Sequence, residues 1–234
     1  MAKDVIIACD FSSAEATLNF LDKFPEGTKP FVKIGMELFY SAGPDIVRQI
    51  KKRGHKIFLD LKLHDIPNTV KKTMQVLASL DIDMTNVHAA GTIDMMKAAI
   101  EGLTRADGTR PLLIAVTQLT STSEERMHKE LLINATIGDT IAQYAFNAKS
   151  AGLDGVVCSP LEASIVKKRC GEGFCAVTPG IRFADSAADD QVRITSPAKA
   201  REIGSDYIVV GRPVTASEDP VAAYNRCVRE FLGK

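Results

Sequence analysis

The chain has 234 residues, of which 45% are hydrophobic and 25% are charged, and its 29 Lys and Arg residues balance its 29 Asp and Glu residues. This composition is typical of a folded globular protein, and the zero net charge excludes an overall basic field that would favour nucleic acid or an anionic membrane. No apolar run in the sequence reaches the roughly 20 residues that a membrane-spanning helix needs, so we expect neither nucleic acid nor membrane as a partner.

Short runs rich in β-branched and other apolar residues recur along the chain and predict eight strands. Most of these runs are almost continuously apolar, as expected for parallel strands that are covered on both faces. They span residues 5–10, 31–36, 56–61, 84–89, 112–117, 155–159, 176–178 and 207–211.

Segments with helical spacing of apolar residues fill the gaps between these runs. The first follows a serine, a preferred capping residue, and several others begin at proline or stop at glycine. The predicted helices span residues 13–24, 44–53, 67–80, 92–103, 137–151, 161–169, 196–203 and 220–232.

Eight alternating strand–helix units predict an α/β protein with a single (β/α)8 barrel over residues 1–234. The alternative is a doubly wound open sheet, which normally carries a glycine-rich turn after its first strand. Here that strand ends in Cys9-Asp10-Phe11-Ser12, without glycine. The active site of a (β/α)8 barrel lies at the carboxyl ends of the strands, so we expect functional residues there.

The third predicted strand ends in a charged hexapeptide, Asp60-Leu61-Lys62-Leu63-His64-Asp65. Strand alternation places Asp60 and Lys62 on one face, and Lys33 lies inside the second strand. A lysine between carboxylates stays charged and is a better proton donor than nucleophile. A network of Lys33, Asp60, Lys62 and Asp65 could protonate a carbanion formed nearby; the alternative is a salt-bridge network that only holds loops together.

Glycine and arginine follow the seventh and eighth strands, whose loops often form the phosphate site of such barrels. Glycine lets backbone N–H groups approach an anion, and arginine offers a bidentate donor. The two segments, Pro179-Gly180-Ile181-Arg182 and Gly211-Arg212, therefore favour a phosphorylated small molecule. The alternative for each is a glycine turn with a surface arginine.

Other polar residues give weaker signals. Thr120 and Ser121 could bind a ligand or cap a helix, and His88 is either catalytic or structural. No H-x-x-H, H-E-x-x-H or Cys/His cluster is present in the sequence, so we predict no metal site. The basic clusters at residues 51–53 and 167–169 are expected on solvated helix ends.

The cysteine pattern indicates the compartment. Five cysteines are scattered, their number is odd, and no C-x-x-C pair occurs. This is typical of a reducing environment rather than of a disulfide framework. The first residues lead directly into an apolar strand without a signal-peptide pattern, so we expect a cytoplasmic protein.

The hexapeptide and the following Ile66-Pro67-Asn68-Thr69 together resemble the D-x-K-x-x-D-I-P-N-T signature of orotidine 5'-phosphate decarboxylases. The D-x-K-x-x-D core alone is shared by related barrels, but the similarity extends over nearly the whole chain. Further matching segments are Asp10, Val32-Lys33-Ile34-Gly35, Thr117-Gln118-Leu119-Thr120-Ser121, Pro179-Gly180-Ile181-Arg182, Gln191 and Val210-Gly211-Arg212-Pro213.

The resemblance implies decarboxylation of orotidine 5'-monophosphate to uridine 5'-monophosphate and CO2 without a cofactor, the last step of UMP biosynthesis. It implies that Lys62 donates a proton to C6 of the pyrimidine. Asp60 would lie beside the substrate carboxylate and, with Asp65, hold Lys62. Lys33 and Asp10 would bind the ribose hydroxyls and complete the charge network.

The resemblance also implies a homodimer with shared active sites, in which Asp65 and Thr69 reach the partner's substrate. Residues 183–190 would form a flexible lid that becomes ordered when phosphate binds. The other implied substrate-binding residues contact the ribose, the pyrimidine edge or the phosphate, or order the phosphate loop: Thr120, Ser121, Pro179, Arg182, Gln191, Gly211 and Arg212.

Two rival functions remain at this point. Magnesium-dependent sugar-phosphate decarboxylases or aldolases of the same barrel group share the D-x-K-x-x-D core, but they use an acidic metal ligand where this chain has Lys33. A cation there opposes binding of a divalent metal. A non-catalytic nucleotide-binding barrel is the second rival, and it would be expected to lack the proton donor that Lys62 supplies.

Overall fold

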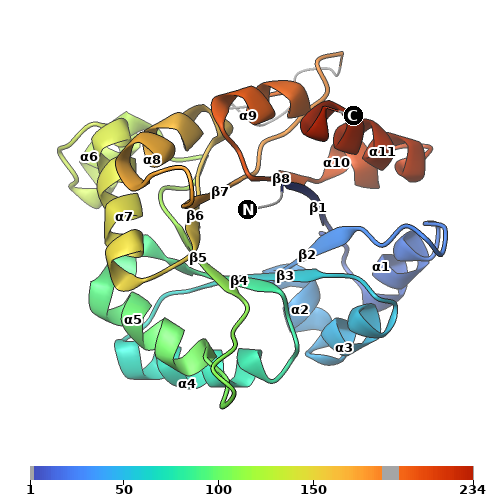
Figure 1. Cartoon of the computed structure of the whole chain (residues 1–234), viewed down its shortest axis with the longest axis horizontal. Coiled ribbons are helices and arrows are strands. Elements are labelled where there is room, and N and C mark those ends of the chain that lie inside the picture. Colours follow the sequence, from blue (N-terminus) through green and yellow to red (C-terminus); the bar gives the residue numbers. More distant parts are fainter. Residues whose placement is uncertain (1–2, 186–194, 234) are drawn as a thin grey trace.

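A closed barrel of eight parallel strands forms the centre of the computed structural model, which describes residues 3–185 and 195–233. Each strand pairs with its neighbours in the chain, and β1 closes the barrel by pairing with β8. Figure 1 shows the helices around this ring of strands. The predicted (β/α)8 fold is confirmed. The strands are β1 (Asp4–Ala8), β2 (Phe31–Gly35), β3 (Ile57–Leu63), β4 (Met84–His88), β5 (Leu112–Val116), β6 (Gly155–Val157), β7 (Cys175–Thr178) and β8 (Tyr207–Val210).

Each predicted helical segment contains a helix, with some shifted ends, and three further helices, α2, α6 and α10, were not predicted. None of the helices in the described part of the chain is long and apolar enough to cross a membrane. The helices are α1 (Ala14–Leu21), α2 (Met36–Ala42), α3 (Asp45–Lys52), α4 (Pro67–Ala78), α5 (Thr92–Leu103), α6 (Glu124–Leu131), α7 (Ile137–Ala151), α8 (Ala163–Cys170), α9 (Pro197–Ile203), α10 (Arg212–Thr215) and α11 (Pro220–Leu232), with 3-10 turns η1 (Ala89–Gly91) and η2 (Pro160–Glu162).

Helix α2 was not predicted, because it follows β2 without a loop and has large apolar side chains that are exposed to solvent. Gly35 precedes it without a side-chain cap, and Met36 and Tyr40 are 44% and 72% exposed. A helix is recognised in a sequence by apolar residues that face the core at regular spacing, and α2 lacks that pattern. Helix α6 does have a sequence signal for its start, since it follows Ser123, a preferred N-cap residue. In the structure, the Ser123 side chain accepts a hydrogen bond from the Arg126 N–H.

The strands are buried on both faces, which explains their continuous apolar sequences. Along β1, Ile6 and Ala8 pack inside the barrel, whereas Val5 and Ile7 pack in the layer between strands and helices. The inner core contains side chains from most strands: Ile6, Ala8, Phe31, Phe58, Met84, Ile114, Cys175, Val177 and Val209. A filled interior leaves the carboxyl end of the barrel as the place for a ligand.

Three aspartates fasten strand starts at the opposite, amino-terminal end of the barrel. Each precedes an even-numbered strand, accepts a hydrogen bond from a backbone N–H of the preceding strand and pairs with a cation. The same arrangement of aspartate, backbone N–H and cation thus occurs at three strand pairs. It stabilises the end of the barrel that lies away from the predicted site. The aspartates are Asp83, Asp154 and Asp206, and their cations are Lys51, Arg110 and Lys167.

Lys167 corrects the prediction that the basic cluster 167–169 is solvated. It is only 7% exposed, and its Nζ donates to Asp206 Oδ2 at 2.6 Å. The same ammonium donates to the carbonyl oxygens of Glu172 and Phe174 at 2.9 and 3.0 Å. A buried lysine is stable when it is paired and hydrogen-bonded in this way, which a sequence pattern of three basic residues does not reveal.

Candidate active site

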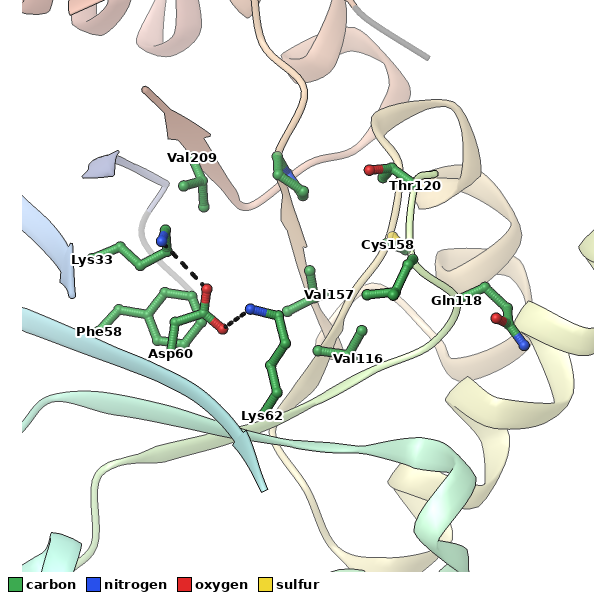
Figure 2. A pocket seen from close by; sticks show the side chains of 12 residues that line it. Lys33, Phe58, Asp60, Lys62, Val116, Gln118, Thr120, Val157, Cys158 and Val209 are labelled. Carbon is green, nitrogen blue, oxygen red and sulfur yellow. Dashed lines mark hydrogen bonds and ion pairs between the residues drawn. The ribbon is translucent and has the colours of Figure 1, made fainter. Parts of the chain in front are cut away.

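Charged side chains meet at the carboxyl end of the barrel, from two neighbouring strands and the segment after a third. Lys33 lies on β2, Asp60 and Lys62 lie on β3, and Asp10 follows β1. Figure 2 shows that the two lysine ammonium groups approach the Asp60 carboxylate from different sides. The structure therefore brings together three members of the predicted network and Asp10, whereas Asp65, its fourth predicted member, does not join them within the chain.

Asp60 is the centre of this charge network. Lys62 Nζ donates to Asp60 Oδ1 at 2.7 Å, and Lys33 Nζ lies 3.4 Å from Asp60 Oδ2. Lys33 Nζ also donates to Asp10 Oδ1 at 2.9 Å. Asp60 is buried, whereas the Asp10 side chain is 58% exposed. The network thus contains two carboxylates and two ammonium groups, and it runs from the solvent to the floor of the site.

Burial and pairing act against each other on the two buried charges. Burial raises the pKa of the Asp60 carboxyl, but the charges of Lys33 and Lys62 and hydrogen bonds to Asp60 outweigh it, so that this pKa lies below its usual value. Burial lowers the pKa of Lys33, but Asp60 and Asp10 outweigh burial and raise it. Both groups are therefore charged at neutral pH, as an electrostatic site requires.

Strand β3 is interrupted where it delivers Lys62. The pairing of β3 with β4 shifts register between Leu59 and Leu63, and Lys62 has a φ of +52°. A left-handed backbone is unusual for a residue with a side chain and costs about 1–2 kcal/mol. Asp60 and Lys62 do meet, as predicted, but across an irregular backbone rather than by the regular strand alternation that the prediction assumed.

Asn86 is part of this arrangement, although no motif identified it. It lies on β4, is fully buried, donates from Nδ2 to Asp60 Oδ1 at 2.7 Å and accepts from the Lys62 N–H at 2.8 Å. The available signal was an amide residue in the middle of a predicted buried strand, because a buried polar side chain needs partners.

A pocket opens beside the charge network at the mouth of the barrel (Figure 2). Thr120 and Pro179, both predicted to bind substrate, line it together with the two lysines and Asp60. Its walls are mostly apolar side chains, as in small-molecule sites that carry a few oriented polar groups. The remaining lining residues are Phe58, Val116, Gln118, Leu119, Val157, Cys158 and Val209.

Of the predicted phosphate-side residues that the structure describes, Pro179 lines this pocket, whereas Arg182, Gly211 and Arg212 are not among its lining residues. The backbone of Arg182 donates to the Thr195 carbonyl at 3.0 Å, and its buried guanidinium donates to the Ile181 carbonyl at 2.9 Å. Gly211 follows β8 and is the N-cap residue of α10, and Arg212 lines a second hollow on the molecular surface. Gln191, and residues 186–190 of the predicted lid, lie outside the described residues.

Three predicted residues lie outside the charge network of one chain. The exposed Asp65 side chain accepts from its neighbour Ile66 N–H at 2.7 Å, and Thr69 is exposed on α4. Ser121 lines a separate hollow beside Thr122. Across the described residues, no group of three or more His, Cys, Asp or Glu side chains is placed to hold a metal ion.

A family model described as the orotidine 5'-phosphate decarboxylase / HUMPS family matches residues 3–227 of the chain. The chain belongs to this family. The chain is 57% identical over 231 residues to an orotidine 5'-phosphate decarboxylase of Bacillus caldolyticus, covering 97% of this chain and 94% of the relative. It is 58% identical over 220 residues to that of Streptococcus thermophilus, covering 94% of each.

Solved structures of relatives have the same fold. The crystal structure of orotidine 5'-phosphate decarboxylase from Lactobacillus acidophilus matches with a TM-score of 0.88 and 43% identity, covering 98% of this chain and 99% of that chain. An uncharacterized conserved protein from Geobacillus kaustophilus matches with a TM-score of 0.87 and 50% identity, covering 97% and 99%. The family predicted from the motif at residues 60–69 and the other matching segments is confirmed.

In this member of the orotidine 5'-phosphate decarboxylase / HUMPS family, His88 ends β4 and lies beside His64. Its ring centroid is 5.7 Å from that of His64. Burial lowers the pKa of His88, and the charges of His64 and Lys62 lower it further. The lowered pKa favours the neutral imidazole, and both the catalytic and the structural roles of His88 stay predictions.

Proposed function

We propose that this chain catalyses the decarboxylation of orotidine 5'-monophosphate to uridine 5'-monophosphate and CO2, the last step of UMP biosynthesis. The observation that carries the proposal is a lysine ammonium held 2.7 Å from a buried aspartate at the mouth of the barrel, in a chain that matches the family over residues 3–227. The named relatives at 57% and 58% identity are orotidine 5'-phosphate decarboxylases.

In the proposed mechanism, the bond between C6 and the carboxylate carbon breaks and its electron pair stays on C6. The Lys62 ammonium stabilises this charge and donates its proton to C6, and the resulting amine regains a proton from solvent. A fixed ammonium is suited to this role because it is oriented before the charge forms. The reaction needs no electron acceptor, and we propose that it uses no cofactor.

The other charges position the substrate and the proton donor. Asp60 lies beside the substrate carboxylate in this proposal, and Lys33 and Asp10 bind the ribose hydroxyls. The 2.9 Å bond from Lys33 to Asp10 supports this role, because it joins the mostly buried lysine to a carboxylate that is 58% exposed at the solvent side of the network. Lys33 Nζ, 3.4 Å from Asp60, also opposes a divalent cation at this position, which argues against the magnesium-dependent rival.

The other parts of the substrate are assigned to residues at the rim of the pocket. Thr120, which lines the pocket, supports an assignment of this loop to the ribose and pyrimidine edge. Binding energy from the remote phosphate can then be used to organise the site around the reacting carbon. The other assigned residues are Ser121 on the pyrimidine side, and Pro179, Arg182, Gln191, Gly211 and Arg212 on the phosphate side.

We also propose that the chain is a homodimer whose active sites are shared, with Asp65 and Thr69 reaching the partner's substrate. Exposed apolar side chains support a covered surface: Met36 and Tyr40 on α2, and Ile66 just before α4, which is 67% exposed. The exposed position of Asp65 fits a residue that acts across an interface.

Two organisational predictions remain proposals. We propose that residues 1–234 form one catalytic domain, supported by the continuous match over residues 3–227. We also propose a cytoplasmic location, supported by five cysteines that are all free and buried.

Loss of orotidine 5'-monophosphate absorbance on addition of the purified protein tests the proposed function. We expect turnover in the parent protein, and the same rate after exhaustive treatment with EDTA. Absence of turnover contradicts the decarboxylase assignment. Activity that is lost with EDTA and restored by Mg²⁺ supports the metal-dependent rival instead.

A further inference from the structure

Asn86 is a buried amide between two charged residues of the site. Its side chain is fully buried on β4, where the register partner on β5 is the apolar Ile114. Leaving a buried amide without partners costs about 1–3 kcal/mol, so the partners that this side chain has are informative. Both lie on β3, and both belong to the charge network.

The two ends of the carboxamide have different and fixed roles. A carboxylate accepts hydrogen bonds only and a backbone N–H donates only, so the amide nitrogen must face Asp60 and its oxygen must face the Lys62 N–H. The contacts are 2.7 Å from Nδ2 to Asp60 Oδ1 and 2.8 Å from the Lys62 nitrogen to Oδ1. A flipped amide would oppose donor to donor and acceptor to acceptor.

The contact with the Lys62 backbone replaces a bond that the strand pairing does not supply. The β3–β4 ladder shifts register between Leu59 and Leu63, and Lys62 adopts the left-handed conformation within this break. A strained backbone persists only where its surroundings hold it. Asn86 holds it through the Lys62 N–H, while its amide nitrogen binds the same Asp60 oxygen that receives the Lys62 ammonium.

We infer that Asn86 is a positioning residue, which sets the Lys62 ammonium against Asp60 by holding the Lys62 backbone and the Asp60 carboxylate with one side chain. The inference rests on the proposed decarboxylase function. Asn86 acts through these two residues, and its removal loosens the proton donor without touching the phosphate side of the site.

The Asn86→Leu variant removes both contacts at similar volume. We expect kcat to fall about a hundredfold, as for loss of one preorganised donor, while the Kd of uridine 5'-monophosphate changes less than threefold. Thr85→Val is the matched control, because Thr85 is equally buried on β4 and its hydroxyl donates only to the Leu59 carbonyl. It should lose thermal stability and keep kcat within threefold of the parent.

Asn86→Asp supplies a readout that a merely structural residue does not change. A protonated carboxyl can keep both contacts, whereas a carboxylate faces Asp60 with like charge. The charged and titratable groups around it are Asp60 and Lys62 on β3, Lys33 on β2, His88 on β4 and, beyond it, His64. Relative to the parent, we expect kcat of this variant to recover at least about tenfold when the pH is lowered from 8 to 5.5.

The outcomes separate the two proposals. A parent protein without decarboxylase activity overturns the proposed function, and with it the role of Asn86. An active parent with an equally active Asn86→Leu variant overturns the positioning role alone. If Asn86→Leu does not fold, Asn86→Asp decides the question, because a pH profile parallel to that of the parent contradicts the inference.

Discussion

Replacement of Lys62 by alanine is the most direct test of the charge network. Asp10, Lys33, Asp60 and Lys62 carry two negative and two positive charges, so the variant leaves a net charge of −1 beside the substrate carboxylate. Loss of a positioned proton donor costs about 10²–10⁴-fold. Loss of a preorganised charge costs about 10²–10³-fold. Together they predict a fall in kcat of at least about 10⁴-fold, or about 5.4 kcal/mol at 1.36 kcal/mol per tenfold.

The assay follows orotidine 5'-monophosphate absorbance under saturating substrate, with binding of uridine 5'-monophosphate measured by calorimetry. Lys56→Ala is the matched control, because Lys56 is an exposed lysine just before β3, at the far end of the same strand. It should retain the parent's kcat. A Lys62→Ala variant that binds the product and turns over within tenfold of the parent would refute the assigned role of Lys62.

Three further results are expected. Mixing Asp65→Ala with Lys62→Ala protein should restore activity through hybrid dimers; no recovery despite demonstrated subunit exchange would contradict a shared site. Lys167→Met should lower the free energy of unfolding in urea by about 3–5 kcal/mol, because it leaves the Asp206 carboxylate without its cation; a loss below 1 kcal/mol would show that this pair contributes little. Burial, and after it neighbouring positive charge, lowers the pKa of His88 in the folded state. The contribution of neutral His88 to stability is therefore present above the unfolded-state pKa of about 6.5, and it is lost as the pH falls through the lower folded-state pKa. The drop in Tm between pH 7.5 and 5.5 should therefore be smaller in His88→Gln, and an equal drop in both proteins would count against this linkage.

Features that depend on neighbouring residues in the chain could be predicted from the sequence. The strands were recognisable because parallel strands buried on both faces need continuous apolar runs, and β1 and β5 show them clearly. Asp60 and Lys62 were predicted to meet because they are close in the chain, although the regular alternation assumed for them is broken at Lys62. Helix α2 could not be predicted from its pattern of apolar residues, since Met36 and Tyr40 are exposed to solvent.

Features that depend on strand pairing were decided only by the tertiary structure. The register of β2 against β3 sets Gly35 opposite Asp60. This register brings the Lys33 ammonium to the Asp60 carboxylate, although the two residues are far apart in the chain. The shifted β3–β4 pairing leaves the Lys62 N–H to the Asn86 side chain. Register and irregular backbone follow from the packing of the whole barrel, so no short motif encodes them.

The motif Asp60–Thr69, with the other matching segments, determined the family by itself and pointed to Lys62 as the proposed proton donor, because such residues and their spacing are local. How that donor is held was a tertiary matter: a lysine on β2 and an amide on β4 reach the same carboxylate from either side of β3. Closing eight strands into a barrel is what brings these groups together, and burial then makes their contacts strong.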